Sequence, residues 1–194
     1  FMLSGVNYYT GQVFDMQRIT KLAQAKGCAV GFDLAHAVGN ANLQLHEWNV
    51  DFAIWCSYKY LNAGPGAVAG CFVHEKHAEN YDLPRFAGWW GHNKQKRFMM
   101  EPDFNPIKGA EGWQLSNVPV FSSATLVASI KIFEEAGMEK LIAKSKRLTG
   151  YLAFLLGEIK TDKIEVITPK VLRGCQLSIR VKGADKSLFN QLHE

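Results

Sequence analysis

Short runs of apolar residues without polar alternation dominate the first 75 residues of the chain. These runs lie at 1–6, 28–32, 51–56 and 67–73. Between the first two, residues 15–26 carry Met, Ile, Leu and Ala at helical spacing, and a second helical stretch is expected at 43–48. Unbroken apolar runs separated by helices are typical of strands buried on both faces. This half therefore predicts an α/β fold with a mainly parallel sheet and helices on both faces.

The pattern changes in the second half of the chain. Residues 81–119 are rich in Trp, Gly, Pro and Asn and show little periodicity, which is typical of a long functional loop. Residues 120–157 carry helical stripes that predict two helices, or one helix bent near Gly137. Residues 164–168 and 175–182 then alternate like a strand pair.

A helix is expected from Asp185 onward, so the tail resembles part of a small α+β domain. We therefore expect residues 1–125 to form the C-terminal part of a large domain, and residues 126–194 to supply a linking helix and a partial small domain. Both ends of the chain fall inside expected elements, which predicts a fragment that lacks material on both sides.

Composition narrows the function classes. The formal net charge is only +4 and the basic clusters at 94–97 and 144–147 accompany no nucleic-acid motif, so we expect no nucleic-acid partner. No apolar run approaches the roughly 20 residues that span a bilayer, so no membrane association is expected. The four cysteines show no paired spacing and lie mostly in apolar segments, which predicts buried, reduced thiols in a cytoplasmic protein.

Two polar residues stand at the ends of two expected strands. Asp33 closes the run at 28–32, and Lys59 follows the run at 51–56, with Tyr58 beside it. His36 comes three residues after Asp33. Ligands of open α/β sheets bind at the carboxyl edge of the sheet. We therefore expect the carboxylate of Asp33 and the amine of Lys59 to lie together at that edge.

Pyridoxal phosphate (PLP) is a cofactor that needs this pair. Its aldehyde forms a Schiff base with a lysine amine, and its pyridine nitrogen is kept protonated by an ionised aspartate. Plainer interpretations remain open on these residues alone. Asp33 could cap the next helix, Lys59 could extend from the sheet to solvent, and His36 could be a packed polar residue.

Other motifs are weaker. Residues 64–70 miss the dinucleotide-binding glycine spacing by one position, and residues 74–77 lack the H-E-x-x-H spacing of zinc proteases, so no metal site is expected. Trp89 and Trp90 lie in an aperiodic stretch with Gly and His, which favours binding of a flat ring or closure of an interface.

Six strings lie in order along nearly the whole chain, namely VGFDLAHAVGN, DFAIWCSYKYLNAGPG, HEKHA, GWWGH, QLSN and RGCQLSI. Taken together, they closely resemble the kynureninase family of fold-type I PLP enzymes. The resemblance implies that Lys59 is the Schiff-base lysine and Asp33 the partner of the pyridine nitrogen. It places His36 beside the ring substituents, and Tyr58 at the cofactor phosphate with a possible part in proton transfer.

Three further positions follow from the resemblance. Ser4 matches a cofactor-site position, Asn117 matches a position on the cofactor and substrate side, and Trp89 matches a tryptophan that reaches the neighbouring subunit's cofactor in a homodimer. The implied reaction is hydrolysis of L-kynurenine, or 3-hydroxy-L-kynurenine, to anthranilate or 3-hydroxyanthranilate and L-alanine, in tryptophan catabolism and NAD biosynthesis. The residues do not rank the two substrates.

The resemblance also limits what the chain can do alone. Much of the phosphate cradle and the arginine that grips the substrate carboxylate lie outside these residues, so the chain by itself is expected to be inactive. Two alternatives remain: another fold-type I PLP enzyme such as a cysteine desulfurase-like lyase, or a non-catalytic fragment acting through its dimer surface. Tyr58 counts against the former, which usually has His before the lysine.

Overall fold

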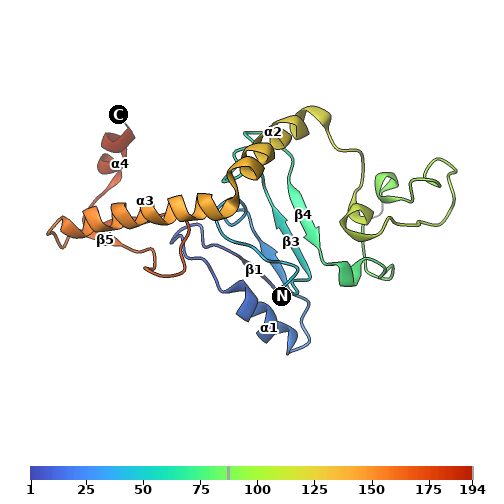
Figure 1. Cartoon of the computed structure of the whole chain (residues 1–194), viewed down its shortest axis with the longest axis horizontal. Coiled ribbons are helices and arrows are strands. Elements are labelled where there is room, and N and C mark those ends of the chain that lie inside the picture. Colours follow the sequence, from blue (N-terminus) through green and yellow to red (C-terminus); the bar gives the residue numbers. More distant parts are fainter. Residues whose placement is uncertain (87, 194) are drawn as a thin grey trace.

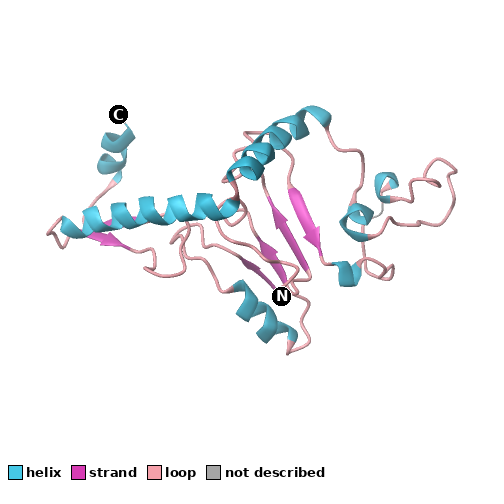
Figure 2. Ribbon diagram, in the orientation of Figure 1, coloured by secondary structure: helices cyan, strands magenta, loops and turns pink. Residues whose placement is uncertain are grey.

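A computed structural model describes residues 1–86 and 88–193 of the chain, and it contains two sheets joined by two consecutive helices (Figures 1 and 2). The first half contains β1 (Met2–Ser4), α1 (Met16–Gln24), β2 (Gly31–Asp33), β3 (Phe52–Trp55) and β4 (Gly70–Val73). Three short 3-10 helices follow: η1 (Glu75–His77), η2 (Trp89–Gly91) and η3 (Gly109–Trp113). The second half contains α2 (Val120–Ala136), α3 (Met138–Glu158), β5 (Ile164–Val166), β6 (Ile179–Val181) and α4 (Lys186–His193).

The larger sheet has the order β1-β2-β3-β4, with β1, β2 and β3 parallel and β4 antiparallel at the edge. The α/β class and the mainly parallel sheet expected from the sequence are thus confirmed. Leu3, Phe32, Ala53 and Phe72 are in register across the four strands, so their side chains share one face. Phe32 and Ala53 are fully buried at the centre of the core.

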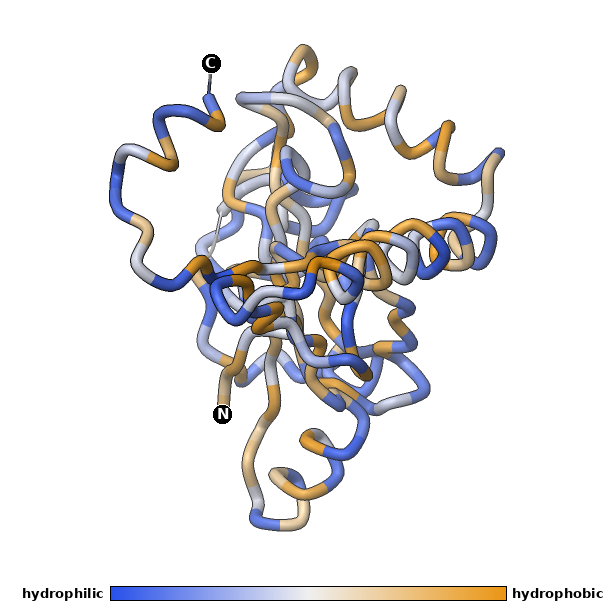
Figure 3. Tube along the Cα trace, turned by 90° about the vertical axis from the view of Figure 1, so that its left-hand side faces the viewer, coloured by the Kyte–Doolittle hydropathy of each residue, from blue (hydrophilic) through white to orange (hydrophobic). Residues whose placement is uncertain are grey.

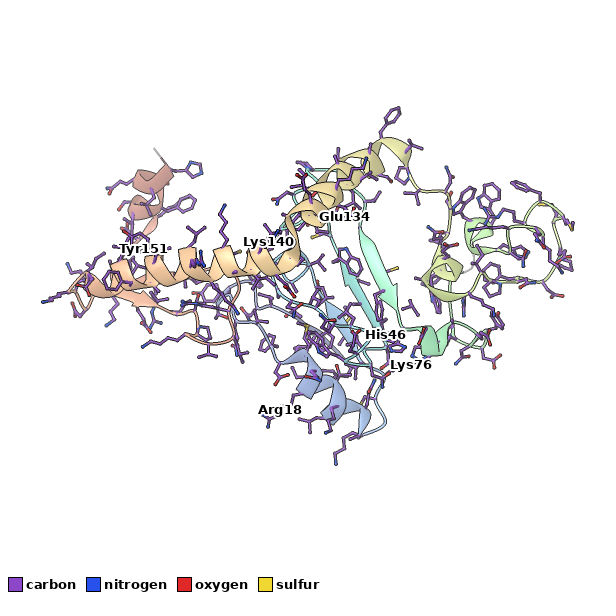
Figure 4. All side chains as sticks on the ribbon, in the orientation of Figure 1. Arg18, His46, Lys76, Glu134, Lys140 and Tyr151 are labelled. Atoms are coloured by element: carbon purple, nitrogen blue, oxygen red, sulfur yellow. The ribbon has the colours of Figure 1, made fainter. Side chains whose placement is uncertain are left out.

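Helix α1 covers that core face, as its amphipathic pattern predicts. Asp15 caps its first turn by accepting a hydrogen bond from the Arg18 N–H (3.0 Å), while Arg18 itself points away from the sheet (Figure 4). Met16 is buried, and Ile19 and Ala23 pack against the same cluster one and two turns later. Hydrophilic and hydrophobic positions are interspersed along the helices (Figure 3).

The opposite face of the sheet is largely exposed. Met2 and Ile54 are 51% and 44% exposed, and Cys71 lies beside Ile54 in the register. All four cysteines are free, as expected, but the prediction that they are buried is wrong for Cys28, Cys71 and Cys175, which are exposed. Cys71 borders an open pocket that Leu83 and Trp113 line from the segment beyond β4, so its thiol stays accessible.

The helix expected at 43–48 is also wrong. These residues form turns, with one helical hydrogen bond from the Trp48 N–H to the Gln44 carbonyl (2.9 Å). Asn49 takes a left-handed conformation (φ 59°), and the Val50 N–H turns back to the Leu45 carbonyl (3.0 Å). This closing pattern ends a helical turn, so the chain enters β3 instead of continuing as a helix.

The break expected near Gly137 is confirmed. Gly137 ends α2 with φ 78°, a conformation that residues with a side chain rarely adopt, and α3 begins at the next residue. The strand pair and the last helix expected from the sequence are present as antiparallel β5–β6 and α4. The domain boundary at residue 125 falls inside α2 and stays a prediction. No helix in the described part of the chain is both long and apolar enough to cross a membrane.

A buried carboxylate joins the starts of the strands. Asp51, directly before β3, accepts hydrogen bonds from the Val30 N–H (2.7 Å), Gln24 Nε2 (3.0 Å) and His77 Nε2 (2.7 Å). Lys76 Nζ lies 2.7 Å from the same carboxylate, at the lower end of β4 in Figure 4. Burial acts to raise the pKa of Asp51, but these hydrogen bonds together hold it well below its usual value.

We predict that Asp51→Asn lowers the free energy of unfolding of the chain by about 3 kcal/mol at pH 7, because it leaves buried donors and a lysine without their anion. A depressed carboxyl pKa stabilises the fold above the ordinary Asp pKa of about 4, and this contribution is lost as the pH falls below it. The difference between wild type and variant should therefore shrink below pH 4 in urea titrations. A difference that is equal at pH 7 and pH 3 would contradict this assignment.

Asp162→Asn is the matched control for that measurement. Asp162 is exposed and its carboxylate makes no hydrogen bond within the described residues. Its substitution should change the free energy of unfolding by less than about 0.5 kcal/mol at either pH.

Candidate active site

A cavity of about 330 Å³ opens at the carboxyl ends of β1 and β2, beside the turn that follows β3. It is lined by Ser4, Val6, Tyr8, Asp33, Ala35, His36 and Lys59. Pockets of about 300 Å³ and more are of the size that holds small ligands. Four of the residues singled out in the sequence, namely Ser4, Asp33, His36 and Lys59, therefore lie together.

Strand pairing places two of these residues. Ser4 and Asp33 are the last residues of β1 and β2 and are partners in the parallel register, so their side chains leave the same face next to each other. Asp33 Oδ1 accepts a hydrogen bond from the Ala35 N–H (2.8 Å). Within the described residues Oδ2 accepts none, so half of the carboxylate can bind a ligand in the cavity.

Lys59 is placed by a tight turn after β3. Ser57 is fully buried, its hydroxyl donates to the Val68 carbonyl (2.6 Å), and its own carbonyl accepts from the Ala63 N–H (3.0 Å). The Asn62 N–H closes the turn on the Lys59 carbonyl (2.9 Å). The backbone of Lys59 is therefore held at both sides, and only its side chain extends into the cavity.

Lys59 and His36 form the closest polar contact of the cavity, with 3.0 Å between Nζ and Nε2. Burial, and then the Lys59 cation, lower the pKa of His36, while Asp33 acts in the opposite direction. The imidazole is therefore neutral at pH 7, and Nε2 is the acceptor because an ammonium group has no lone pair. Nδ1 is buried and has no hydrogen-bond partner in the described part of the chain.

Tyr58 stands at the rim of the site. It is 54% exposed, does not line the cavity, and its ring centroid lies 5.8 Å from Lys59 Nζ. The neighbouring Cys56 side chain is the main cause that raises the pKa of the Tyr58 phenol. The phenol stands close to Lys59, outside the cavity lining.

Trp89 and Asn117 do not line the cavity. Trp89 lies in η2, in the extended segment beyond β4 (Figure 1), where it packs edge-to-face on Trp90 and Phe98 at centroid distances of 5.4 and 5.5 Å. It is 48% exposed. Asn117 is exposed, and its Oδ1 accepts a hydrogen bond from the Ser116 hydroxyl (3.0 Å).

Sequence reasoning missed Tyr8 as a wall of the cavity. Tyr8 follows the apolar run at 1–6, in the connection that leads to the helical stretch at 15–26. A loop that leaves the carboxyl end of a parallel strand borders the ligand side of the sheet, and this rule could have found Tyr8. Its ring lies 6.3 Å from the His36 ring between centroids.

The fold and the cavity define an α/β protein with an amine and a carboxylate at the carboxyl edge of a mainly parallel sheet. The chain belongs to the aminotransferase class-V family, whose sequence profile matches residues 1–192.

The chain is similar to curated proteins named kynureninase. The kynureninase of Flavobacterium psychrophilum is 57% identical over 196 residues, which cover 98% of this chain and 46% of that protein. The kynureninase of Myxococcus xanthus is 58% identical over 193 residues, covering 98% of this chain and 45% of that protein. The chain thus spans about half the length of these relatives.

Solved structures support the fold. A C-DES variant with glycine covalently linked to its PLP cofactor superposes with a TM-score of 0.81 at 18% identity, covering 99% of this chain and 50% of that one. The cysteine desulfurase CsdA of Escherichia coli gives a TM-score of 0.75 at 16% identity, covering 96% of this chain and 44% of that one. At such identities the likeness concerns the fold alone.

We predict opposite effects of the two charged neighbours on the pKa of His36, measured by NMR titration of the imidazole in the chain without ligand. Lys59→Met removes a cation and should raise the pKa of His36, whereas Asp33→Asn removes an anion and should lower it. His36→Gln identifies the resonance. Shifts in the same direction, or none, would contradict the cavity geometry.

Proposed function

We propose that the full-length protein, with the length of its relatives, holds PLP in this cavity and hydrolyses L-kynurenine to anthranilate and L-alanine. The observation that carries the proposal is the meeting of Lys59 and Asp33 in one cavity, in a chain 57% identical to a curated kynureninase. 3-Hydroxy-L-kynurenine, which would yield 3-hydroxyanthranilate, is the second substrate of the proposal. The tryptophan catabolic pathway and NAD biosynthesis are the proposed setting of this reaction.

The chemistry of the lining residues fits the cofactor. Lys59 offers a primary amine to an aldehyde, and Asp33 has a free carboxylate oxygen for a protonated ring nitrogen. A contact of that kind is worth about 4 kcal/mol at an effective dielectric near 20, which favours the charged ring. When bound, PLP supplies an electron sink for the substrate carbon that carries the amine.

The residues of this chain then divide the work of holding the cofactor and moving protons. Lys59 must lose a proton to attack an aldehyde, and the neutral His36 imidazole is the adjacent group that accepts its hydrogen bond. With the substrate held by the cofactor, the free amine of Lys59 would be placed to remove the proton from the α-carbon. Ser4 and Asn117 are proposed as further contacts of the cofactor, the former from inside the cavity.

Tyr58 is proposed as the general acid and as a phosphate contact. Hydrolysis of the bond next to the side-chain carbonyl needs water to add to that carbonyl and a proton to reach the alanine carbon that is released. A phenol with the ordinary tyrosine pKa of about 10 carries its proton at neutral pH. That of Tyr58 lies at the rim beside Lys59.

A homodimer completes the proposal. Trp89 and Phe98, which are 48% and 73% exposed, form an aromatic surface on the extended segment, and Phe86 nearby in sequence is 89% exposed. Exposed aromatic clusters of this kind are enriched at protein interfaces. We propose that Trp89 contributes from this surface to the partner subunit's cofactor site. The four free cysteines support a cytoplasmic location.

We predict that borohydride reduction of the full-length protein with PLP attaches the cofactor to Lys59, as mapped by mass spectrometry, and that Lys59→Ala abolishes the attachment. Lys26→Ala, at an exposed lysine outside the cavity, should leave it unchanged. Asp33→Ala should retain attachment but lower the rate of anthranilate release by roughly 100-fold or more, because the charge that stabilises the transition state is removed.

The same experiment separates the alternatives. Attachment at Lys59 with no anthranilate fluorescence after addition of kynurenine would indicate another PLP enzyme, such as a cysteine desulfurase-like lyase. No attachment at Lys59 would indicate a protein that acts without the cofactor.

A further inference from the structure

The segment at 172–178, which we call the strap, connects the smaller sheet to the cavity. It precedes β6 and runs back to the loops that follow β1 and β2. The Val13 N–H donates to the Leu172 carbonyl (2.8 Å), and Arg173 forms an antiparallel bridge with Gln12. The strap is therefore paired with the chain just beyond the loop that carries Tyr8.

The loop at 7–12 is closed on itself. Asn7 Oδ1 accepts hydrogen bonds from the N–H groups of Tyr9 and Thr10, both at 3.0 Å, and the Gly11 N–H donates to the Asn7 carbonyl (2.8 Å). These bonds hold the shape of the loop, so its position is set by what its outward carbonyls contact.

Two side chains of the strap bind those carbonyls. Gln176 Nε2 donates to the Tyr8 carbonyl (2.8 Å) and to the Ser178 hydroxyl (2.8 Å). The Ser178 hydroxyl in turn donates to the Tyr9 carbonyl (2.6 Å). One amide and one hydroxyl thus hold the loop that places Tyr8 at the cavity.

The strap also holds the opposite wall. Asn40 is buried, its Oδ1 accepts from the Cys175 N–H (2.8 Å), and its Nδ2 donates to the His36 carbonyl (2.9 Å). The fit is close: a Cβ on Gly174 would lie 2.3 Å from Asn40 Oδ1. Tyr8 and His36, which face each other across the cavity, are therefore both tied to one segment of the C-terminal half.

We propose that Gln176 and Ser178 are positioning residues that set the spacing between Tyr8 and His36, and with it the affinity of the cavity for its cofactor. Neither residue lines the cavity, so they act through the loop at 7–12. This proposal rests on the proposed function, because it takes PLP as the cofactor that the cavity binds. It adds that the C-terminal half controls how tightly PLP is held.

The test uses Gln176→Met, which keeps the length of the side chain without its amide, and the pair Ser178→Ala and Ser178→Thr, of which only the second keeps the hydroxyl. Gln191→Met, at an exposed residue of α4, is the control. Hydrogen–deuterium exchange of residues 7–13 is measured in each variant without ligand. The dissociation constant of PLP is measured by absorption in the full-length protein, together with kcat and KM.

We expect faster exchange at residues 7–13 in Gln176→Met and Ser178→Ala, and a dissociation constant for PLP raised about five-fold, the effect of one lost hydrogen bond. Ser178→Thr should restore both values, and with saturating PLP kcat should change less than KM. Unchanged exchange at residues 7–13 would overturn the proposal. Faster exchange with unchanged PLP affinity would also overturn it, because the contact would then be structural and would not affect the cavity.

Failure of the proposed function gives a different result. The wild-type protein would then bind no PLP at Lys59 at all, whereas the exchange at residues 7–13 would still respond to Gln176→Met.

Discussion

The carboxylate of Asp51 is the constraint on which the arrangement of the larger sheet depends. At one edge it joins the end of α1, the residue before β2, the start of β3 and the helix η1. The strands are short, and a strand of three residues spans only about 10 Å. Fixing the starts of β2 and β3 therefore fixes their ends, where Asp33 and the turn with Lys59 lie. A slip of one residue would move Asp33 to the other face of the sheet.

The two edges of the sheet show why one cluster of charges is structural and the other is suited to chemistry. Both carboxylate oxygens of Asp51 accept hydrogen bonds, and Lys76 balances the negative charge. The carboxylate therefore has no acceptor position left for a ligand. Around Lys59 the polar groups are only partly paired. Among residues 1–86 and 88–193, Asp33 keeps a free oxygen and His36 keeps an unpaired Nδ1, which leaves hydrogen-bonding capacity for a bound molecule.

Much of this arrangement could be predicted from the sequence, for physical reasons that differ by element. The apolar runs identified the strands because parallel strands are buried on both faces, and the end of each run placed Asp33 and Lys59 at one edge. The helix expected at 43–48 was wrong because the left-handed Asn49 closes its first turn, which spacing alone does not reveal. Asp51 was counted as the first residue of a strand, since its donors come from segments far apart in sequence.

The hydrogen bonds from Gln176 and Ser178 to the loop at 7–12 could not be predicted from the sequence either. Gln176 and Ser178 belong to a segment whose alternation indicated a strand, and nothing in that pattern points to residues more than 160 positions earlier. Tyr58 was found by its adjacency to Lys59. The positions of Trp89 and Asn117 outside the cavity follow from the aperiodic segment that carries them, whose path is set by contacts and not by periodicity.

The single glycine between α2 and α3 has a mechanical consequence. Gly137, which has no side chain, is the one residue between α2 and α3, and the strap ties the chain beyond α3 to the loops that follow β1 and β2. The chain between Gly137 and the strap is therefore held at both of its ends, so its position is coupled to that of the Tyr8 loop.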